Sequence, residues 1–194
     1  MRKLTYYIAC SLDGFIGDPK GDATSMYKFI DAEYLAFMNA EYPETVPTQA
    51  RAQLGIDAPN KRFDTVIQGL NSYRLALDEG VTSPYAHLRQ YVATRSLTQS
   101  PSPDVELIAE DLVGRVRALK AEDGDKDIWL CGGSQIAGEL VDEIDELIIK
   151  SYPQLYGTGM PMFGGAGFEP RDFVLDGVRT FGNGVAVRTY TRKR

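Results

Sequence analysis

Two adjacent glycines stand where an apolar run gives way to an amphipathic one, in the stretch IWLCGGSQIAGELV of residues 128–141. The apolar run predicts a buried strand over 127–131, and the amphipathic pattern predicts a helix that begins near Ser134. A helix N-terminus carries unpaired N–H groups and a partial positive charge, and glycine lets a ligand approach the backbone closely. Gly132 and Gly133 are therefore candidate phosphate-binding residues, although a strand-to-helix turn can also use glycine for its conformation alone.

Other residues that could take part in chemistry give weaker indications of a functional site. The glycine spacing is not the G-x-G-x-x-G of a Rossmann turn, and it comes late in the chain. His87 is the single histidine and has no acidic residue at a suggestive spacing, so a catalytic role is not expected. The carboxylates of residues 142–146 predict a charged turn, because so short a connection does not supply convergent ligands; no metal site is expected.

Alternating apolar runs and helical patterns predict the elements that position these residues. Strands are expected over 4–9, 64–68, 88–95, 105–109, 127–131 and 144–152, and helices over 26–40, over 70–77, after Asp111 as N-cap, and from Ser134. Residues 171–193 read as two strands joined by a Gly-Asn-Gly turn. The order predicts an α/β fold with a mixed, mostly parallel central sheet, flanking helices and a C-terminal antiparallel hairpin.

Size and composition favour one domain over residues 1–194, with an insertion at about 41–62 that contains three prolines and one helical turn near 49–54. Hydrophobic residues make up 43% of the chain, yet no apolar stretch is long enough to span a bilayer. The net charge of −6 argues against a nucleic-acid partner. Cys10 and Cys131 lie in strand-like runs and are expected to be reduced thiols, which favours a cytoplasmic protein.

Four stretches, taken in order, resemble the dihydrofolate reductase fold, and more closely its branch related to the reductase domain of riboflavin biosynthesis. They are YYIACSLDGFIG (6–17), FDTVIQGLNSY (63–73), IWLCGGSQIAGELV (128–141) and VDEIDELIIKSYPQLYGTGMPMF (141–163). The resemblance implies an NADPH-dependent reductase that transfers hydride to a small heterocycle, such as a pteridine or a ribosylated pyrimidine. It also implies a homodimer. No zinc-deaminase ligand spacing is present, so a bifunctional riboflavin enzyme is not expected.

The resemblance assigns cofactor contacts to several turns. The pyrophosphate would meet Gly132, Gly133, Ser134, Gln135 and Ile136, and a second anion-binding turn would be formed by Gly69, Leu70, Asn71 and Ser72. The adenosine 2′-phosphate would meet Thr94, Arg95 and Ser96, and the nicotinamide would be flanked by Ala9, Ile16 and Gly17. Arg95 is the natural residue for selecting NADPH over NADH, because a guanidinium forms paired, charged hydrogen bonds to phosphate.

The resemblance assigns fewer residues to the substrate side of the cofactor. Asp13, in the Ser-Leu-Asp-Gly arrangement of the riboflavin branch, is the leading acid, although an Asx-turn role before Gly14 is the alternative. Asp31 is a second catalytic candidate, with Glu33 as its competitor; Tyr152 and Tyr156 are substrate contacts or packing residues.

Two residues depart from the family pattern. Leu70 stands where the family commonly has an arginine, and Ala137 where dihydrofolate reductases often have a tyrosine. Both changes predict weaker cofactor binding. They motivate a second hypothesis, in which the chain binds a nicotinamide nucleotide without catalysis and acts as a sensor or carrier.

Overall fold

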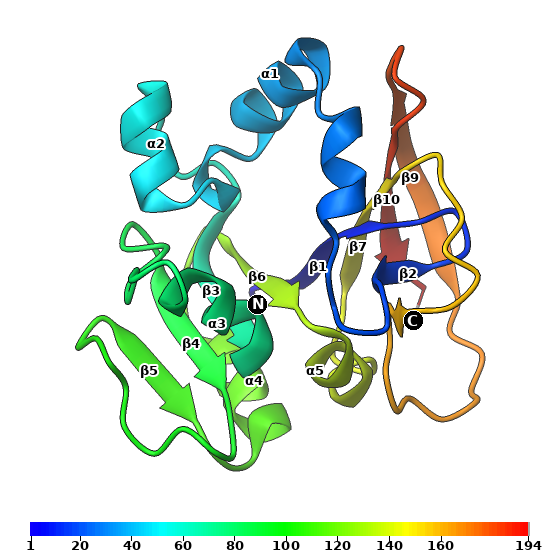
Figure 1. The fold of residues 1–194 in the computed structure, drawn as a ribbon. Coiled ribbons are helices and arrows are strands. Elements are labelled where there is room, and N and C mark those ends of the chain that lie inside the picture. The colour runs from blue at the N-terminus through cyan, green and yellow to red at the C-terminus, as the bar shows by residue number, and fades with distance from the viewer. Residues whose placement is uncertain (194) are drawn as a thin grey trace.

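A computed structural model describes residues 1–193, and an eight-stranded sheet runs through its centre (Figure 1). The strands of this sheet are β1 (Leu4–Cys10), β3 (Phe63–Gly69), β4 (Arg89–Ala93), β5 (Val105–Ile108), β6 (Asp127–Gly132), β7 (Glu146–Ser151), β9 (Phe173–Thr180) and β10 (Ala186–Arg192). The strands β2 (Phe15–Gly17) and β8 (Met160–Pro161) form a separate, two-stranded sheet. The order across the sheet is β5-β4-β3-β6-β1-β7-β10-β9. Neighbours from β5 to β7 are parallel, and the β9–β10 hairpin adds an antiparallel edge, which confirms the predicted architecture.

Helical segments connect these strands. They are the 3₁₀ helices η1 (Thr24–Phe29) and η2 (Pro43–Thr45) and the α-helices α1 (Ala32–Glu41), α2 (Thr48–Leu54), α3 (Leu70–Leu77), α4 (Leu112–Ala121) and α5 (Ser134–Glu139). Asp111 caps α4 as predicted, since its carboxylate accepts a hydrogen bond from the Gly114 amide at 3.0 Å. Within residues 1–193, no helix is both long enough and apolar enough to cross a membrane.

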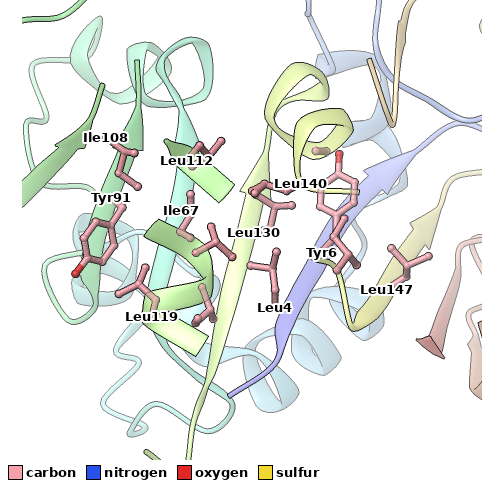
Figure 2. Packing of buried hydrophobic residues seen from close by; sticks show 14 residues of the cluster. Leu4, Tyr6, Ile67, Tyr91, Ile108, Leu112, Leu119, Leu130, Leu140 and Leu147 are labelled. Carbon is pink, nitrogen blue, oxygen red and sulfur yellow. The ribbon is translucent and has the colours of Figure 1, made fainter. Parts of the chain in front are cut away.

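Successive side chains of the strands point alternately into two apolar layers, one on each face of the sheet. Figure 2 shows the first layer, in which Leu4 and Tyr6 of β1 and Leu130 of β6 belong to the same cluster as Leu119 of α4. The second layer contains Tyr7 of β1, which packs edge-on against Trp129 of β6 at 6.1 Å between ring centroids. Adjacent residues of one strand thus serve opposite layers, and both faces of the central strands are covered.

The prediction of one continuous helix over 26–40 is wrong. The segment breaks at Ile30 and Asp31, so that η1 and α1 are separate helices. Asp31 has extended backbone angles, and its carboxylate caps α1 by accepting a hydrogen bond from the Tyr34 amide at 2.9 Å. Both helices bury residues in the second layer, namely Met26 and Tyr34, which explains why the apolar pattern runs through the break. The short strands β2 and β8 were not predicted.

The insertion predicted at about 41–62, called the excursion below, is attached to the sheet by Glu44, whose side chain is fully buried. Its carboxylate accepts hydrogen bonds from the backbone amides of Arg62 and Phe63, each at 2.8 Å, and of Lys61 at 3.3 Å. These amides lie where the chain enters β3. One carboxylate therefore sets where the excursion ends and the strand begins. The helical turn predicted near 49–54 is confirmed as α2.

His87 completes the attachment of the excursion. Its Nε2 atom lies 2.8 Å from the carbonyl oxygen of Glu44, and its Nδ1 atom lies 3.2 Å from the hydroxyl of Thr48. Burial lowers the pKa of the imidazole, partly offset by the hydrogen bond to the Glu44 carbonyl. Both ring nitrogens contact residues of the excursion, which gives His87 a structural role.

We predict that Glu44→Ala lowers the free energy of unfolding by about 2 to 4 kcal/mol, because it leaves buried amides without an acceptor. Glu41→Ala is the matched control, since Glu41 is exposed at the end of α1, and it should change the free energy by less than about 0.5 kcal/mol. Urea denaturation followed by far-UV circular dichroism measures both. Equal effects of the two substitutions would contradict the assignment.

Candidate functional site

The carboxyl ends of the parallel strands gather most of the predicted site residues at one edge of the sheet. In spatial order these strands are β4, β3, β6, β1 and β7. Arg95 follows β4, Gly69 ends β3, Gly132 ends β6, and Ala9 lies near the end of β1. With neighbouring strands about 4.8 Å apart, the row from β4 to β7 is about 19 Å long. In open α/β sheets, ligands bind outside this edge.

Two glycine turns meet in the middle of the row. A Cβ atom placed on Gly69 would lie 3.4 Å from the Gly133 nitrogen, and one placed on Gly133 would lie 3.7 Å from the Ser72 hydroxyl. α3 begins at Leu70, directly after the first turn, and α5 begins at Ser134, directly after the second. The Gly132–Gly133 peptide is cis, and Gly132 has φ +118°, a conformation that other L-residues rarely adopt. The structure thus brings two helix N-termini together.

Buried polar atoms without partners mark the same turns. Ser134 is 4% exposed, and its hydroxyl has no hydrogen-bond partner among the described residues. Gln68, which pairs with Gly132 across the sheet, is 2% exposed, and its side-chain nitrogen is also unpartnered. Buried polar groups in native proteins are almost always hydrogen-bonded. A bound polar ligand at the glycine turns would supply the missing partners, so these residues fit a nucleotide cofactor.

Gly164 holds α5 against the chain segment that follows β8. Its amide donates a hydrogen bond to the Ser134 carbonyl oxygen at 2.9 Å, and a Cβ there would lie 2.5 Å from the Ser134 hydroxyl. The segment can approach the start of α5 this closely because residue 164 is glycine. Gln135 is exposed beside it, and Ile136 is partly buried.

The end of β4 presents an unpaired cation. The Thr94 hydroxyl accepts hydrogen bonds from the amides of Ser96 and Leu97, at 3.2 and 3.0 Å, and so shapes the turn after the strand. Arg95 projects from this turn, is exposed, and has no hydrogen bond or ion pair among the described residues. Thr94 is therefore occupied by the turn, whereas Arg95 is available to an anionic ligand. Leu70 packs against the small apolar cluster around Tyr73, and Asn71 is exposed.

At the other end of the row, a small second sheet holds the segment predicted to flank the nicotinamide. β2, which contains Ile16 and Gly17, pairs with β8. A Cβ on Gly159 would lie 2.3 Å from the Gly17 carbonyl oxygen, so the two segments touch through their backbones. The Gly14 carbonyl also accepts a hydrogen bond from the Met162 amide at 3.1 Å. This part of the site is therefore held in place by residues far along the chain.

Asp13 has a different role from the proton donor expected from the sequence. Its carboxylate accepts hydrogen bonds from the Ser11 hydroxyl at 2.6 Å and from the amides of Gly157 and Tyr156, at 2.7 and 3.1 Å. These donors, the Ser11 hydroxyl first, lower the pKa of Asp13 to about 2. The ionised form is therefore favoured at neutral pH, which argues against a role as general acid. The structure instead gives Asp13 the task of tying the loop after β1 to the loop after β7.

The other substrate-side candidates have partners of their own in the structure. Asp31 is exposed, and its carboxylate is used as the cap of α1. Tyr152 is buried, with its hydroxyl 3.1 Å from that of Tyr34 and its ring edge-on to the Tyr34 ring. Tyr156 is partly exposed, and its hydroxyl lies 2.7 Å from that of Ser25. Tyr152 is thus a packing residue, and Tyr156 is the tyrosine of the pair that is open to solvent.

Lys150 is the residue that sequence reasoning missed. It lies on β7 in register with Ala9 of β1, and its Nζ atom is 3.9 Å from the centre of the Tyr7 ring. Burial lowers its pKa to about 8. The signal was present in the sequence: Lys150 is two residues after Ile148 in an apolar strand, and alternation places both on the core-facing side.

The two cysteines are free thiols close to this lysine. Burial raises the pKa of Cys131 to about 12 and that of Cys10 to about 11. At neutral pH both are therefore protonated and uncharged. They are unsuited to nucleophilic chemistry, which needs the thiolate.

Known proteins of similar sequence and fold indicate the family of the chain. A sequence model of the RibD C-terminal domain matches residues 2–187. The uncharacterized protein YwjB of Bacillus subtilis is 28% identical over 186 residues, which is 95% of each chain. A crystal structure described as a putative riboflavin biosynthesis protein from Shewanella sp. PV-4 is 25% identical, covers all of both chains and superposes with a TM-score of 0.71.

Two more distant crystal structures share the fold. The first is a diaminohydroxyphosphoribosylaminopyrimidine deaminase/5-amino-6-(5-phosphoribosylamino)uracil reductase from Thermotoga maritima, at 19% identity and TM-score 0.64; the match covers 99% of this chain and 57% of that one. The second is a pyrimidine reductase-like protein from Corynebacterium diphtheriae, at 15% identity and TM-score 0.62, with 100% and 92% covered. The family model extends over nearly the whole sequence, and the chain therefore belongs to the RibD C-terminal domain family.

Proposed function

We propose that this chain is an NADPH-dependent reductase that transfers hydride to a ribosylated pyrimidine or a related pteridine. The observation that carries the proposal is the meeting of two glycine turns and two helix N-termini at the carboxyl edge, next to the unpartnered hydroxyl of the buried Ser134. Such a site favours a pyrophosphate, because backbone N–H groups and helix dipoles converge on it. Family membership supports the same reading.

The strand order gives the cofactor a direction along the edge. Arg95, after β4, is suited to the adenosine 2′-phosphate, because it is exposed and has no partner within residues 1–193. Gly69 and Gly133, at the ends of β3 and β6, are suited to the pyrophosphate. Ala9, on β1, is then the neighbour of the nicotinamide.

Hydride is the chemistry that NADPH supplies when bound. The chain's own part is to orient the cofactor and the substrate and to keep water away from them. The β2–β8 pairing and the Asp13 hydrogen bonds fix the loops on the nicotinamide side. Reacting groups held in this way lose little entropy on the way to the transition state.

The substrate class rests on the relatives. The Thermotoga maritima structure carries the name of a 5-amino-6-(5-phosphoribosylamino)uracil reductase, and that from Corynebacterium diphtheriae is called pyrimidine reductase-like. A ribosylated aminopyrimidine is therefore the first substrate to test, and a pteridine such as dihydrofolate is the second.

We predict saturable NADPH binding by the wild-type chain, followed by energy transfer from Trp129 to the bound nicotinamide. We also predict NADPH oxidation, monitored at 340 nm, with 5-amino-6-(5-phosphoribosylamino)uracil in a panel that includes dihydrofolate. Absence of saturable binding up to about millimolar NADPH would sink the proposal, since functional affinities for such ligands are tighter. Binding without oxidation on any heterocycle would instead fit the carrier hypothesis.

We predict that Arg95→Ala weakens NADPH binding about ten- to a hundred-fold, because one charged hydrogen-bond pair to phosphate contributes about 1.5 to 3 kcal/mol. NADH lacks the 2′-phosphate, so its dissociation constant should change by less than about twofold. Arg74→Ala is the comparison, since Arg74 is the exposed arginine on the neighbouring α3. An equal loss of NADPH and NADH affinity refutes the assignment to Arg95, and a selective loss in Arg74→Ala transfers it to Arg74.

We further propose that the protein is a homodimer that buries β9. This strand is the edge of the sheet, on the right in Figure 1, and all of its residues are exposed or partly exposed. Val174, Leu175 and Val178 on it are 51, 51 and 53% exposed. Long apolar edge strands left open promote aggregation, so a second copy of the chain is a fitting cover.

We predict that Val178→Lys converts the dimer into a monomer, because it places a charge on the exposed edge strand that the partner would cover. Leu54→Lys is the matched control, since Leu54 on α2 is also 53% exposed, and it should leave the mass unchanged. Size-exclusion chromatography with light scattering measures the mass. A monomeric wild type, or a dimer that survives Val178→Lys, would count against this interface.

A further inference from the structure

Lys150 lies beside the position expected for the nicotinamide. It is directly in register with Ala9 on β1 and with Val187 on β10, and it packs on the same face of the sheet as Tyr7 and Cys131. Its Nζ atom stands 3.9 Å above the centre of the Tyr7 ring. The ammonium is therefore on the face of the sheet where Ala9 also points, one strand away from it.

No carboxylate within the described residues 1–193 forms an ion pair with this ammonium. Within residues 1–193, Lys150 makes no ion pair, and the titratable groups that affect it are the Cys131 thiol from β6 and the Cys10 thiol from β1. Tyr7 on β1 offers its ring face, Tyr152 at the end of β7 is bonded to Tyr34, and Arg188 on β10 acts on Cys10. Buried lysines are normally paired, so a partly buried amine whose neighbours are an aromatic face and two neutral thiols is unusual.

Hydride transfer to a C=N or C=O bond also needs a proton donor, and the expected one is unsuitable. Asp13 is held as a carboxylate by three hydrogen-bond donors. Asp31 caps α1, and both ring nitrogens of His87 contact the excursion at 41–62. Among residues 1–193, Lys150 is the cationic side chain on the face beside Ala9 that makes no ion pair and no hydrogen bond.

We propose that Lys150 is the proton donor of the reduction, an inference that rests on the proposed function. The hydride that NADPH supplies adds to the carbon of the substrate C=N or C=O bond. The π electrons of that bond pass to its nitrogen or oxygen, which takes a proton from Nζ of Lys150. Lys150 is left as a neutral amine and regains its proton from solvent, so charge and atoms balance.

The electrostatic environment agrees with this role. Burial lowers the pKa of Lys150 to about 8, close to the pH at which a general acid works best. The donor form is present below that pKa and is lost above it. The pH profile of kcat/KM should therefore be flat near pH 7 and should fall about tenfold per pH unit above about 8.

The test compares three variants by NADPH oxidation with 5-amino-6-(5-phosphoribosylamino)uracil. Lys150→Met should lower kcat about 100-fold or more, the usual contribution of a general acid, while the dissociation constant of NADPH changes less than about twofold. Lys150→Arg keeps the charge but not the transferable proton, so it should remain slow and should lose the alkaline limb. Lys28→Met is the control, since Lys28 is exposed and also lies over a ring, 5.0 Å from the centre of Phe29.

A second measurement does not need turnover. Trace acetylation of the wild-type chain is measured by mass spectrometry across a pH series. The acetylation rate of Lys150 should reach half of its maximum near pH 8. A midpoint above about 10, the value of an ordinary lysine, overturns the proposal. An inactive wild type refutes the proposed function and the donor role together. An active wild type in which Lys150→Met keeps its kcat within about threefold, or keeps the alkaline limb, refutes the donor role alone.

Discussion

The parallel register of β3, β6, β1 and β7 is the constraint on which the site depends. Parallel strands end at a common edge, so residues 60 or more positions apart in sequence become neighbours without any direct attraction between them. Gly69 meets Gly133 because β3 pairs with β6, and Lys150 stands beside Ala9 because β7 pairs with β1. The two apolar layers hold this register, since a slip of one residue would exchange the faces of every strand.

The elements that define the edge could be predicted from the sequence because each is encoded locally. Apolar alternation marks the strands, Asp111 marks the start of α4, and the glycine pair marks the turn before α5. The break at Asp31 was missed although its signal was local. Met26 and Tyr34 bury into one layer on either side of it, so the helical pattern continued where the helix did not.

The roles of individual side chains were less predictable, because they depend on partners far along the chain. Asp13 receives hydrogen bonds from amides 143 and 144 residues away, and these donors add to that of Ser11 in lowering its pKa. No pattern around Ser-Leu-Asp-Gly encodes them. The β2–β8 pairing has the same origin, since its strands are too short to carry periodicity and exist only because the two loops pack together.

The fold places the two charged groups at the nicotinamide end of the site in opposite environments. Asp13 is exposed, yet three donors satisfy it, so its ionised form is strongly favoured and its proton affinity is low. Lys150 is partly buried and has an aromatic face in place of an anion, so its charged form is disfavoured and its proton is easily released. A carboxylate of this kind is suited to holding loops, and an ammonium of this kind is suited to giving up a proton. In this site, the number of hydrogen-bond partners therefore distinguishes Asp13, which positions loops, from Lys150, which can donate a proton. Residue type alone does not distinguish these two roles as well.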